Sequence, residues 1–257
     1  MSRLAVLILT YNEEHHIAGC IQSASFADEI VVVDSGSSDR TVALAEAHEA
    51  KVVQHPMTEG FAAQRNFALT CTDADWVLYL DADERITPEL AAEIQKAVSS
   101  GAAACYSIKR YSIAFGQKMK YGVCRPDTVV RLFPLDAAEW EGMVHEGIKS
   151  NLPRRQLPSY MEHYTYTSWD RYFQKFNQYT TLWAEASYKK GKRCTQASII
   201  GHAAGSFLQM GILKRGFFDG FYGFVLCCFH FSYTLAKYIK LYELQKRGAK
   251  SRADCNP

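Results

Sequence analysis

The sequence lacks several patterns that mark well-defined protein classes. Its eight cysteines form no Cys-x-x-Cys pair and follow no regular spacing. This disfavours a zinc site or a disulfide framework and indicates a reducing compartment. No Gly-x-Gly-x-x-Gly follows the first apolar run, and no Gly-x-x-x-x-Gly-Lys segment occurs anywhere. These absences argue against a dinucleotide-dependent oxidoreductase and against a P-loop enzyme. Internal repeats and low-complexity tracts are also missing.

Charge is distributed unevenly along the chain. Residues 1–100 hold 6 Lys or Arg against 16 Asp or Glu, a net charge of −10, whereas residues 189–257 hold 12 against 3, a net charge of +9. The asymmetry suggests two functions, a catalytic one for the acidic half and a partner-binding one for the basic, aromatic end. The first residues run directly into a strand pattern without a signal peptide, so we expect a cytosolic protein.

Apolar runs alternate with helical patterns over the first 100 residues. The predicted strands are 4–9, 29–33, 52–53 and 76–80, and the predicted helices are 13–25, 40–50, 60–71 and 88–99. Continuous apolar runs, rather than alternating ones, are typical of strands buried on both faces of a parallel sheet. The sequence therefore predicts an α/β fold with a doubly wound, mostly parallel sheet, whose ligands bind at the carboxyl ends of the strands.

Polar residues follow three of these strands. Residues 10–13 follow the first, Asp34 follows the second, and Asp81 and Asp83 follow the fourth, in the stretch "VLYLDADERI". Carboxylates in this arrangement suit Mg²⁺ or Mn²⁺, which would offset their repulsion and neutralise a leaving diphosphate. The alternatives are a solvated acidic strand end for Asp81 and Asp83, and a turn or capping role for Asp34.

The pattern changes after residue 100. Residues 104–113 and 128–133 are predicted strands, residues 139–148 are a mixed loop or strand segment, and the chain is predicted to be helical from about residue 167. We therefore expect a catalytic domain over residues 1–165 and a helical, basic and aromatic extension over residues 166–257.

Four segments of the first 100 residues occur in a characteristic order: "LAVLILTYNEEHHIAGCIQS", "DEIVVVDSGSSDRTVALAE", "GFAAQRNFAL" and "DWVLYLDADERITPEL". The segments "RPDTVVRLF" and "WEGMVHE" follow them. Together they resemble family 2 glycosyltransferases of GT-A fold. Within the family, they look like the subgroup of small lipopolysaccharide-core glucosyltransferases that act on inner-core heptose. The resemblance implies a nucleotide-sugar donor such as UDP-glucose, a divalent cation (Mn²⁺ or Mg²⁺), inversion to a β-linkage, and a saccharide or glycolipid acceptor.

The resemblance also implies roles for individual residues. The nucleotide or donor sugar would be bound by Thr10, Tyr11, Asn12, Glu13, Asp34, Gln64, Arg65, Asn66 and Asp81. Asp83 would be the main metal ligand, with Asp81 or His163 as further ligands. Arg131 would neutralise phosphate, unless it is simply a surface residue of its strand.

The catalytic base is less clearly marked, because the family's usual Glu-Asp or Asp-Asp pair is absent. A base has to reach the acceptor hydroxyl from a loop over the donor. The candidates in "WEGMVHE" are Glu146, then Glu141, and His145. His145 and His163 are alternatively metal or diphosphate ligands, or structural hydrogen-bonding residues.

The segment of residues 216–247 contains an uncharged, aromatic stretch with Lys and Arg residues beside it. From Gly220 to Ala236 there is no Asp, Glu, Lys or Arg. This composition favours a segment in the interface of an anionic bilayer, so we expect a peripheral protein of the inner face of the cytoplasmic membrane. The alternatives are a buried helix or homo-oligomer contact, and a short membrane span.

Other function classes fit less well. In a phosphatase of the haloacid-dehalogenase type the Asp-x-Asp motif follows the first strand, whereas here it follows the fourth. A non-catalytic membrane-peripheral binding protein on a degenerate transferase scaffold is the main alternative, although Asp34, Asp81 and Asp83 are all present. Nucleic acid is disfavoured as a partner, because the apolar stretch beside the basic residues suits lipid better.

Overall fold

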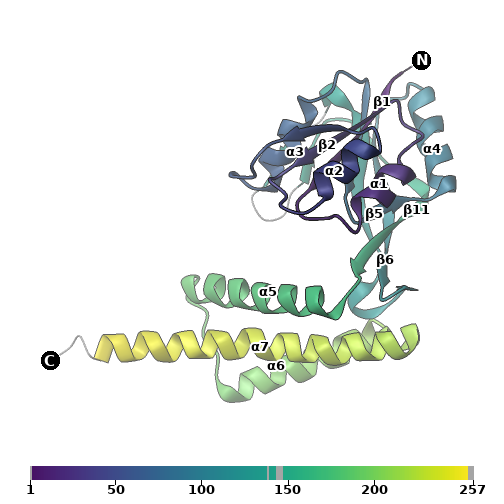
Figure 1. Cartoon of the computed structure of the whole chain (residues 1–257). Coiled ribbons are helices and arrows are strands. Elements are labelled where there is room, and N and C mark those ends of the chain that lie inside the picture. The colour runs from purple at the N-terminus through teal and green to yellow at the C-terminus, as the bar shows by residue number, and fades with distance from the viewer. Residues whose placement is uncertain (1, 138, 143–146, 254–257) are drawn as a thin grey trace. The chain divides into compact units, whose positions relative to one another are not determined.

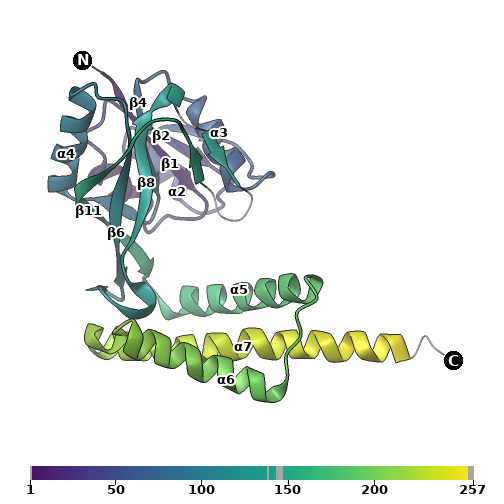
Figure 2. The ribbon, with the colours of Figure 1, turned by 180° about the vertical axis from the view of Figure 1, so that it is seen from behind.

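The computed structural model describes residues 2–137, 139–142 and 147–253. The chain divides into two compact units, one of residues 1–111 and 127–164 and the other of residues 112–126 and 165–257. Figures 1 and 2 show the ribbon from opposite sides. Residues 112–126 thus belong to the same unit as the C-terminal helices. The predicted boundary after residue 165 had placed them in the catalytic domain.

The first unit is built on four parallel strands that alternate with helices. The strands are β1 (Leu4–Thr10), β2 (Glu29–Asp34), β3 (Lys51–Gln54) and β4 (Trp76–Asp81). The helices are α1 (Ile17–Ser23), α2 (Thr41–Ala47), α3 (Phe61–Leu69) and α4 (Pro88–Ser99). These elements confirm the predicted strand–helix alternation. Residues 13–16 form a turn before α1 rather than its first turn.

Successive residues of β1 point to opposite faces of the sheet, and both faces are buried. Val6 and Ile8 pack in one core with residues from α1, α2 and α4. Leu7 packs in a second core with Tyr79 and Phe133 and with residues from α3. Burial on both faces explains why the strands are continuously apolar.

Antiparallel strands extend the sheet beyond β4. They are β5 (Glu84–Ile86), β6 (Cys105–Ala114), β7 (Gln117–Lys118), β8 (Asp127–Pro134) and β11 (Arg154–Tyr166). The order is β3-β2-β1-β4-β8-β6-β11-β5, and β7 pairs with β6. A separate two-stranded sheet joins β9 (Glu139–Glu141) to β10 (Gly147–Lys149). The parallel half confirms the predicted α/β fold, and the antiparallel additions make the whole sheet a mixed one.

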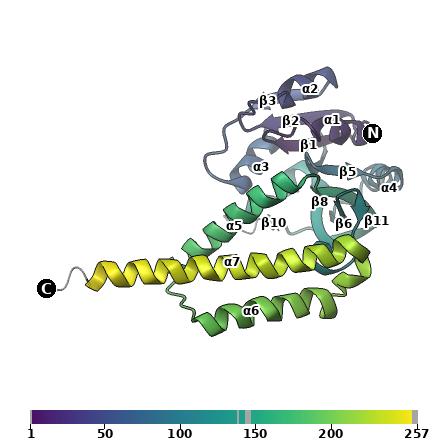
Figure 3. The same ribbon diagram turned by 60° about the horizontal axis from the view of Figure 1, so that its bottom comes forward.

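The second unit is helical, as predicted. Its α-helices are α5 (Trp169–Lys189), α6 (Gln196–Leu208) and α7 (Gly220–Ala253). The short helices η3 (Gln209–Leu213) and η4 (Gly216–Asp219) join α6 to α7. The three long helices lie side by side, with α7 against both others (Figure 3). Within the described ranges, no helix has the length and apolarity needed to cross a bilayer.

Candidate functional site

The carboxyl ends of three strands meet at one edge of the sheet. Thr10 pairs with Asp34 between β1 and β2, and Leu9 pairs with Asp81 between β1 and β4. The predicted convergence of these polar groups is therefore confirmed in the backbone. The Thr10 side chain is buried, and its hydroxyl has no hydrogen-bond partner among the described residues. A buried hydroxyl of this kind is available to a bound ligand.

Two loops beyond this edge are fastened to each other. Asn12 has a left-handed backbone (φ 54°), and its Oδ1 accepts from the Ser38 amide at 2.8 Å. The Asn12 amide donates to Ser37 Oγ at 2.8 Å. The fully buried Asp34 carboxylate accepts from the amides of Gly36 and Ser37 at 3.0 and 2.9 Å. Asp34 therefore has the turn role that was one of its two alternatives, and its contact with a nucleotide stays a prediction.

Residues 11 and 13 lie in the same loop. The Tyr11 side chain is 58% exposed, so its ring is accessible to a base. The Glu13 amide donates to Thr41 Oγ1 at 2.8 Å, and the Glu13 carbonyl accepts the amides that begin α1. The loop is thus held from both of its ends, with Tyr11 left open.

Helix α3 carries three residues that are predicted to bind the donor, and their side chains make different contacts. Buried Gln64 bonds His55 through both ends of its amide, at 2.8 and 2.7 Å, and so holds the strand end near Ser35. Asn66 donates to the Trp140 carbonyl and accepts from the Trp140 amide, both at 2.9 Å. These contacts make Gln64 and Asn66 supports for neighbouring backbone. Arg65 is the one whose side chain reaches the sheet edge.

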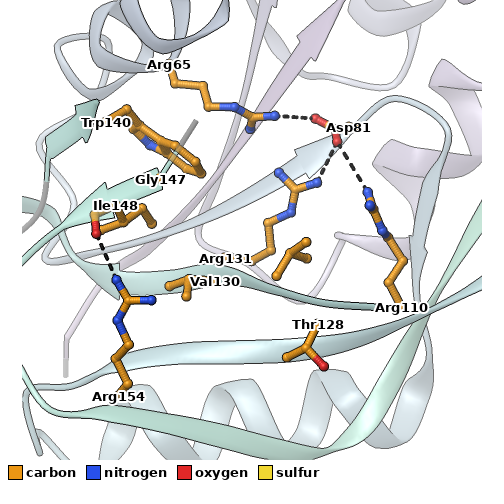
Figure 4. A pocket seen from close by; sticks show the side chains of 11 residues that line it. Arg65, Asp81, Arg110, Thr128, Val130, Arg131, Trp140, Gly147, Ile148 and Arg154 are labelled. Atoms are coloured by element: carbon orange, nitrogen blue, oxygen red, sulfur yellow. Dashed lines mark hydrogen bonds and ion pairs between the residues drawn. The ribbon is translucent and has the colours of Figure 1, made fainter. Parts of the chain in front are cut away.

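Three arginines converge on Asp81 at the end of β4 (Figure 4), and two of them also bind Glu84 of β5. The Asp81 carboxylate accepts from Arg65 Nη2 at 2.9 Å and from Arg131 Nη2 at 2.5 Å, and Arg110 Nη1 lies 3.9 Å away. Glu84 has no exposed surface and accepts from Arg131 at 2.7 Å, from Arg110 at 2.8 Å and from the Asp81 amide at 2.9 Å. Arg131 is therefore a buried member of an ion-pair network and not a surface residue.

This network fixes the charge state of its members. Burial alone would raise the pKa of Asp81, but Arg131 and Arg65 outweigh it and hold that pKa well below its ordinary value. Burial would likewise lower the pKa of Arg110, but its hydrogen bonds and attraction to Asp127 and Glu84 raise it instead. Asp81 is thus an anion at neutral pH whose charge is already balanced by guanidinium groups.

Asp83 lies next to the network and has a different partner. Its Oδ2 is 3.3 Å from His163 Nε2, and both side chains are about one-fifth exposed, at 21% and 20%. In the part of the chain that the structure describes, no group of three or more His, Cys, Asp or Glu could hold a metal. The predicted ligands Asp81, Asp83 and His163 are therefore not assembled as a set, because Asp81 turns to its arginines. Asp83 and His163 remain a pair that fits a cation whose other ligands are water and phosphate oxygens.

A pocket of about 490 Å³ opens beside this network (Figure 4). It is lined by residues of α3, β4, β6, β8, β9, β10 and β11: Arg65, Asp81, Arg110, Thr128, Val129, Val130, Arg131, Trp140, Gly147, Ile148 and Arg154. The Arg65 guanidinium lies 4.7 Å from the centre of the Trp140 ring. The buried Nε of Arg131 has no partner among the described residues. The pocket therefore offers guanidinium donors and an aromatic wall, a combination suited to an anionic, ring-containing ligand.

The candidate bases are only partly described. Glu141 is exposed and forms an ion pair with Lys149 at 2.7 Å across the β9–β10 pair. His145 and Glu146 lie outside the described residues. The described residues Trp140, Gly147 and Ile148 do line the pocket.

Sequence reasoning missed the buried acid Glu84 and the charged and aromatic residues Arg110, Trp140 and Arg154. The last three line the pocket. One signal for Glu84 exists in the sequence: Arg131 interrupts the apolar run "TVVRLF", and a guanidinium buried in a strand needs an acidic partner. Trp140 and Arg154 carry no comparable signal, because their places depend on the β9–β10 pair and on β11.

Comparison with known proteins identifies relatives along the whole chain. The family model described as Glycosyl transferase family 2 matches residues 5–143, more than half of the chain. An uncharacterised glycosyltransferase of Rickettsia typhi is 28% identical, over 98% of this chain and 90% of its own length. The lipopolysaccharide core biosynthesis glycosyltransferase LpsC of Rhizobium meliloti is also 28% identical, over 98% of this chain and 96% of its own.

Solved structures give weaker likenesses. S. aureus TarS has a TM-score of 0.46 and 16% identity, over 84% of this chain and 45% of TarS. The glucosyl-3-phosphoglycerate synthase of Mycobacterium tuberculosis, solved with Mn²⁺ and UDP, has a TM-score of 0.37 and 24% identity, over 43% of this chain and 44% of the synthase. This chain thus spans less than half of each solved chain. The sheet order and the family match together confirm the predicted GT-A-type α/β fold with a helical C-terminal region.

Proposed function

The chain belongs to glycosyl transferase family 2, and from that premise we propose that it is an inverting, divalent-cation-dependent hexosyltransferase. Its donor is a nucleotide sugar, UDP-glucose or a similar UDP-hexose, and its acceptor is a lipopolysaccharide inner-core or other lipid-linked saccharide. The relative named for lipopolysaccharide core biosynthesis supports this acceptor class, because it matches nearly the full length of both chains. The observation that carries the proposal is the meeting of the Asp81 arginine network and the Asp83–His163 pair at one end of β4.

The nucleotide fits the edge where β1 and β2 end. The buried Thr10 hydroxyl, which none of the described residues bonds, supplies a hydrogen-bonding group, and the exposed Tyr11 ring supplies a stacking surface. Asn12 and Glu13 hold this loop in place, and Asp34 holds the facing loop. A base and ribose bound here would place their diphosphate toward the end of β4, since β1 lies between β2 and β4.

The diphosphate fits the cationic side of the pocket. Arg65 and Arg131 already offer guanidinium groups to one carboxylate, and phosphate oxygens accept the same planar donors. Asp83 and His163 would hold Mn²⁺ or Mg²⁺, whose charge would stabilise the departing diphosphate. Both contributions act on charge that develops as the sugar leaves, so they favour the transition state over the bound donor.

In the proposed reaction, an acceptor hydroxyl attacks the anomeric carbon on the face opposite the diphosphate. A new C1–O bond forms, the C1–O bond to phosphate breaks with its electron pair going to the diphosphate, and the hydroxyl proton passes to a base. Glu146, Glu141 and His145 remain the candidate bases. Attack from the opposite face inverts the anomeric centre and gives a β-linkage from an α-linked donor.

Calorimetric titration tests the donor and metal assignments together. UDP, ADP and GDP would be titrated into the protein with and without Mn²⁺, and the titrations repeated with Asp83→Asn. Exposed Asp136→Asn, which removes the same charge from the same unit outside the site, is the matched control. Of the three nucleotides, we expect only UDP to bind. Mn²⁺ should strengthen UDP binding by the unsubstituted protein and by Asp136→Asn, but not by Asp83→Asn. Equal Mn²⁺-dependent binding by Asp83→Asn would show that the cation site is elsewhere.

We also propose that the helical unit attaches the enzyme to the inner face of the cytoplasmic membrane, where a lipid-linked acceptor would be presented. The basic, aromatic composition of residues 189–257 supports this attachment, with a net charge of +9. Pelleting of the protein with anionic vesicles tests it.

A further inference from the structure

Seven large apolar side chains are exposed where α6 turns into α7. They lie within residues 208–224, here termed the α6–α7 corner: Leu208, Ile212, Leu213, Phe217, Phe218, Phe221 and Phe224. Leu213, Phe218 and Phe221 are each about three-quarters exposed, at 76%, 78% and 74%. Single exposed apolar residues are ordinary on protein surfaces, but seven within 17 consecutive residues mark a surface that meets an apolar partner.

The backbone of this corner is firmly held, so these side chains are displayed on a fixed frame. The buried Asp219 carboxylate accepts from the Tyr121 amide at 2.7 Å and from the Lys120 amide at 3.0 Å. Gly122 lies so close to Gly216 that an added Cβ would be 2.7 Å from the Gly216 Cα, and its amide donates to the Lys214 carbonyl at 2.8 Å. Because the frame is fixed, the exposed rings cannot collapse onto the unit without breaking these contacts.

The exposed charges of the corner and of residues 112–126, which hold it, have one sign. Residues 112–126 and 208–224 together contain five Lys or Arg and a single acid, Asp219. That acid is buried, whereas Lys120, Arg125, Lys214 and Arg215 are exposed. An apolar surface that carries these exposed cations is complementary to acyl chains beneath anionic headgroups.

Arg215 adds an independent sign of function. It has a left-handed backbone (φ 56°), a conformation that favours Gly or Asn over a long side chain. It stands between η3 and η4, where Lys214 precedes it and the exposed Phe217 and Phe218 follow. A charged residue held in this conformation at the tip of an apolar surface points to a role for its side chain outside the fold.

We infer that the α6–α7 corner is the membrane-inserting element of this protein and that its partner is a bilayer with anionic phospholipid headgroups. Leu213, Phe218 and Phe221 enter the acyl region, and Lys214 and Arg215 bind the headgroup phosphates. The inference deepens the proposed membrane attachment and places it in 17 residues, whereas most of α7 packs against α5 and α6 (Figure 3). A second copy of the chain fits less well, because a twofold contact would set Lys214 and Arg215 against the same residues of the other copy, and residues 208–224 contain no exposed acid to offset them.

Vesicle sedimentation tests the inference with matched variants of the full-length chain. Leu213→Gln, Phe218→Gln and Phe221→Gln are combined in one variant, and Leu182→Gln with Ile200→Gln forms the control. The control residues lie on α5 and α6 and are 51% and 64% exposed. A third variant, Lys214→Gln with Arg215→Asn, removes the tip charges and keeps a residue that tolerates the left-handed backbone. The vesicles are phosphatidylcholine with and without phosphatidylglycerol, at low and high salt.

We expect the protein and the control to bind only the anionic vesicles. The corner variant should bind at least about tenfold more weakly, since withdrawing one large apolar side chain is enough for a tenfold change. The variant Lys214→Gln with Arg215→Asn should bind the anionic vesicles roughly fivefold more weakly for each charge removed, and its binding should lose most of its dependence on salt. Unchanged vesicle binding by the corner variant would overturn the inference. So would a dimer in sedimentation velocity that the corner variant alone dissociates, with no vesicle binding, because a second copy would then cover the surface.

The same variants separate this inference from the proposed enzyme activity. The corner and the nucleotide edge belong to different units, so UDP binding by calorimetry should be equal in the protein and the corner variant. Vesicle binding without UDP binding would contradict the donor assignment alone, and UDP binding without vesicle binding would contradict the corner alone.

Discussion

Replacing Glu84 with Gln tests the arginine network directly. The substitution keeps the size of the side chain and an oxygen that can accept the Asp81 amide, but it removes a charge with no exposed surface. Arg131 and Arg110 each lose an ionic partner, at 2.7 and 2.8 Å. Arg131 is 3% exposed, so water cannot replace that partner.

The expected cost follows from this geometry. Breaking a buried ion pair by removing one partner costs about 3–5 kcal/mol. Arg131 keeps Asp81 and Arg110 keeps Asp127, so we expect the lower end, about 3 kcal/mol. In a chain of this size each kcal/mol shifts Tm by roughly 2–4 °C, which gives a decrease of about 6–12 °C.

The assay is urea and thermal unfolding, followed by circular dichroism and by tryptophan fluorescence. Trp140 stacks on Arg65 and so reports on the first unit. Asp127→Asn is the control, because it removes the other acid bound to Arg110 from a side chain that is 53% exposed, and it should cost at most about 1 kcal/mol. If Glu84→Gln costs no more than this control, the network is not a buried one and the reasoning fails.

Three further predictions concern other parts of the chain. Asn66→Ala removes both bonds to Trp140, so unfolding free energy should fall by about 2 kcal/mol and donor binding should weaken, as measured by urea unfolding and calorimetry. Gly122 and Gly116 both have a positive φ, but a Cβ added at Gly122 would clash with Gly216, whereas one added at Gly116 would meet open space. Thermal unfolding should therefore show a clearly larger decrease in Tm for Gly122→Ala than for Gly116→Ala. Burial lowers the pKa of His230, so as pH falls the unfolded chain binds a proton at this residue before the folded chain does. The contribution of neutral His230 to the free energy of unfolding is therefore fully present above about pH 6.5 and is lost below it. In unfolding experiments at pH 5–7, the free energy of unfolding of His230→Gln should depend less steeply on pH.

The parallel half of the first unit could be predicted because one physical signal determines it. Strands buried on both faces are continuously apolar, and each ends where the run meets a polar residue. The signal fixed β1 and β4 to within one residue of their ends at Thr10 and Asp81. It also placed the polar groups at one edge, because carboxyl ends of parallel strands lie together.

The partners of those polar groups could not be predicted, because they come from distant parts of the chain. Asp81 meets Arg131 across 50 positions, and Asn66 meets Trp140 across 74. Each pairing depends on the register of an antiparallel strand or on a loop, and neither leaves a periodic signal. The assignment of residues 112–126 to the second unit was missed for a similar reason. It rests on backbone amides that bind Asp219 about 100 positions away.

These unforeseen partners decide which acid of the Asp-x-Asp stretch suits a cation. A divalent ion at Asp81 would lie within reach of Arg65 and Arg131, and it would have to displace guanidinium groups already balanced by that carboxylate. Asp83 instead faces a histidine, and a neutral imidazole can serve as a second ligand without repulsion. The arginines thus leave Asp83 as the better of the two carboxylates for the proposed cation. Under the proposed function, Asp81 would hold their guanidinium groups where the phosphates of the donor arrive.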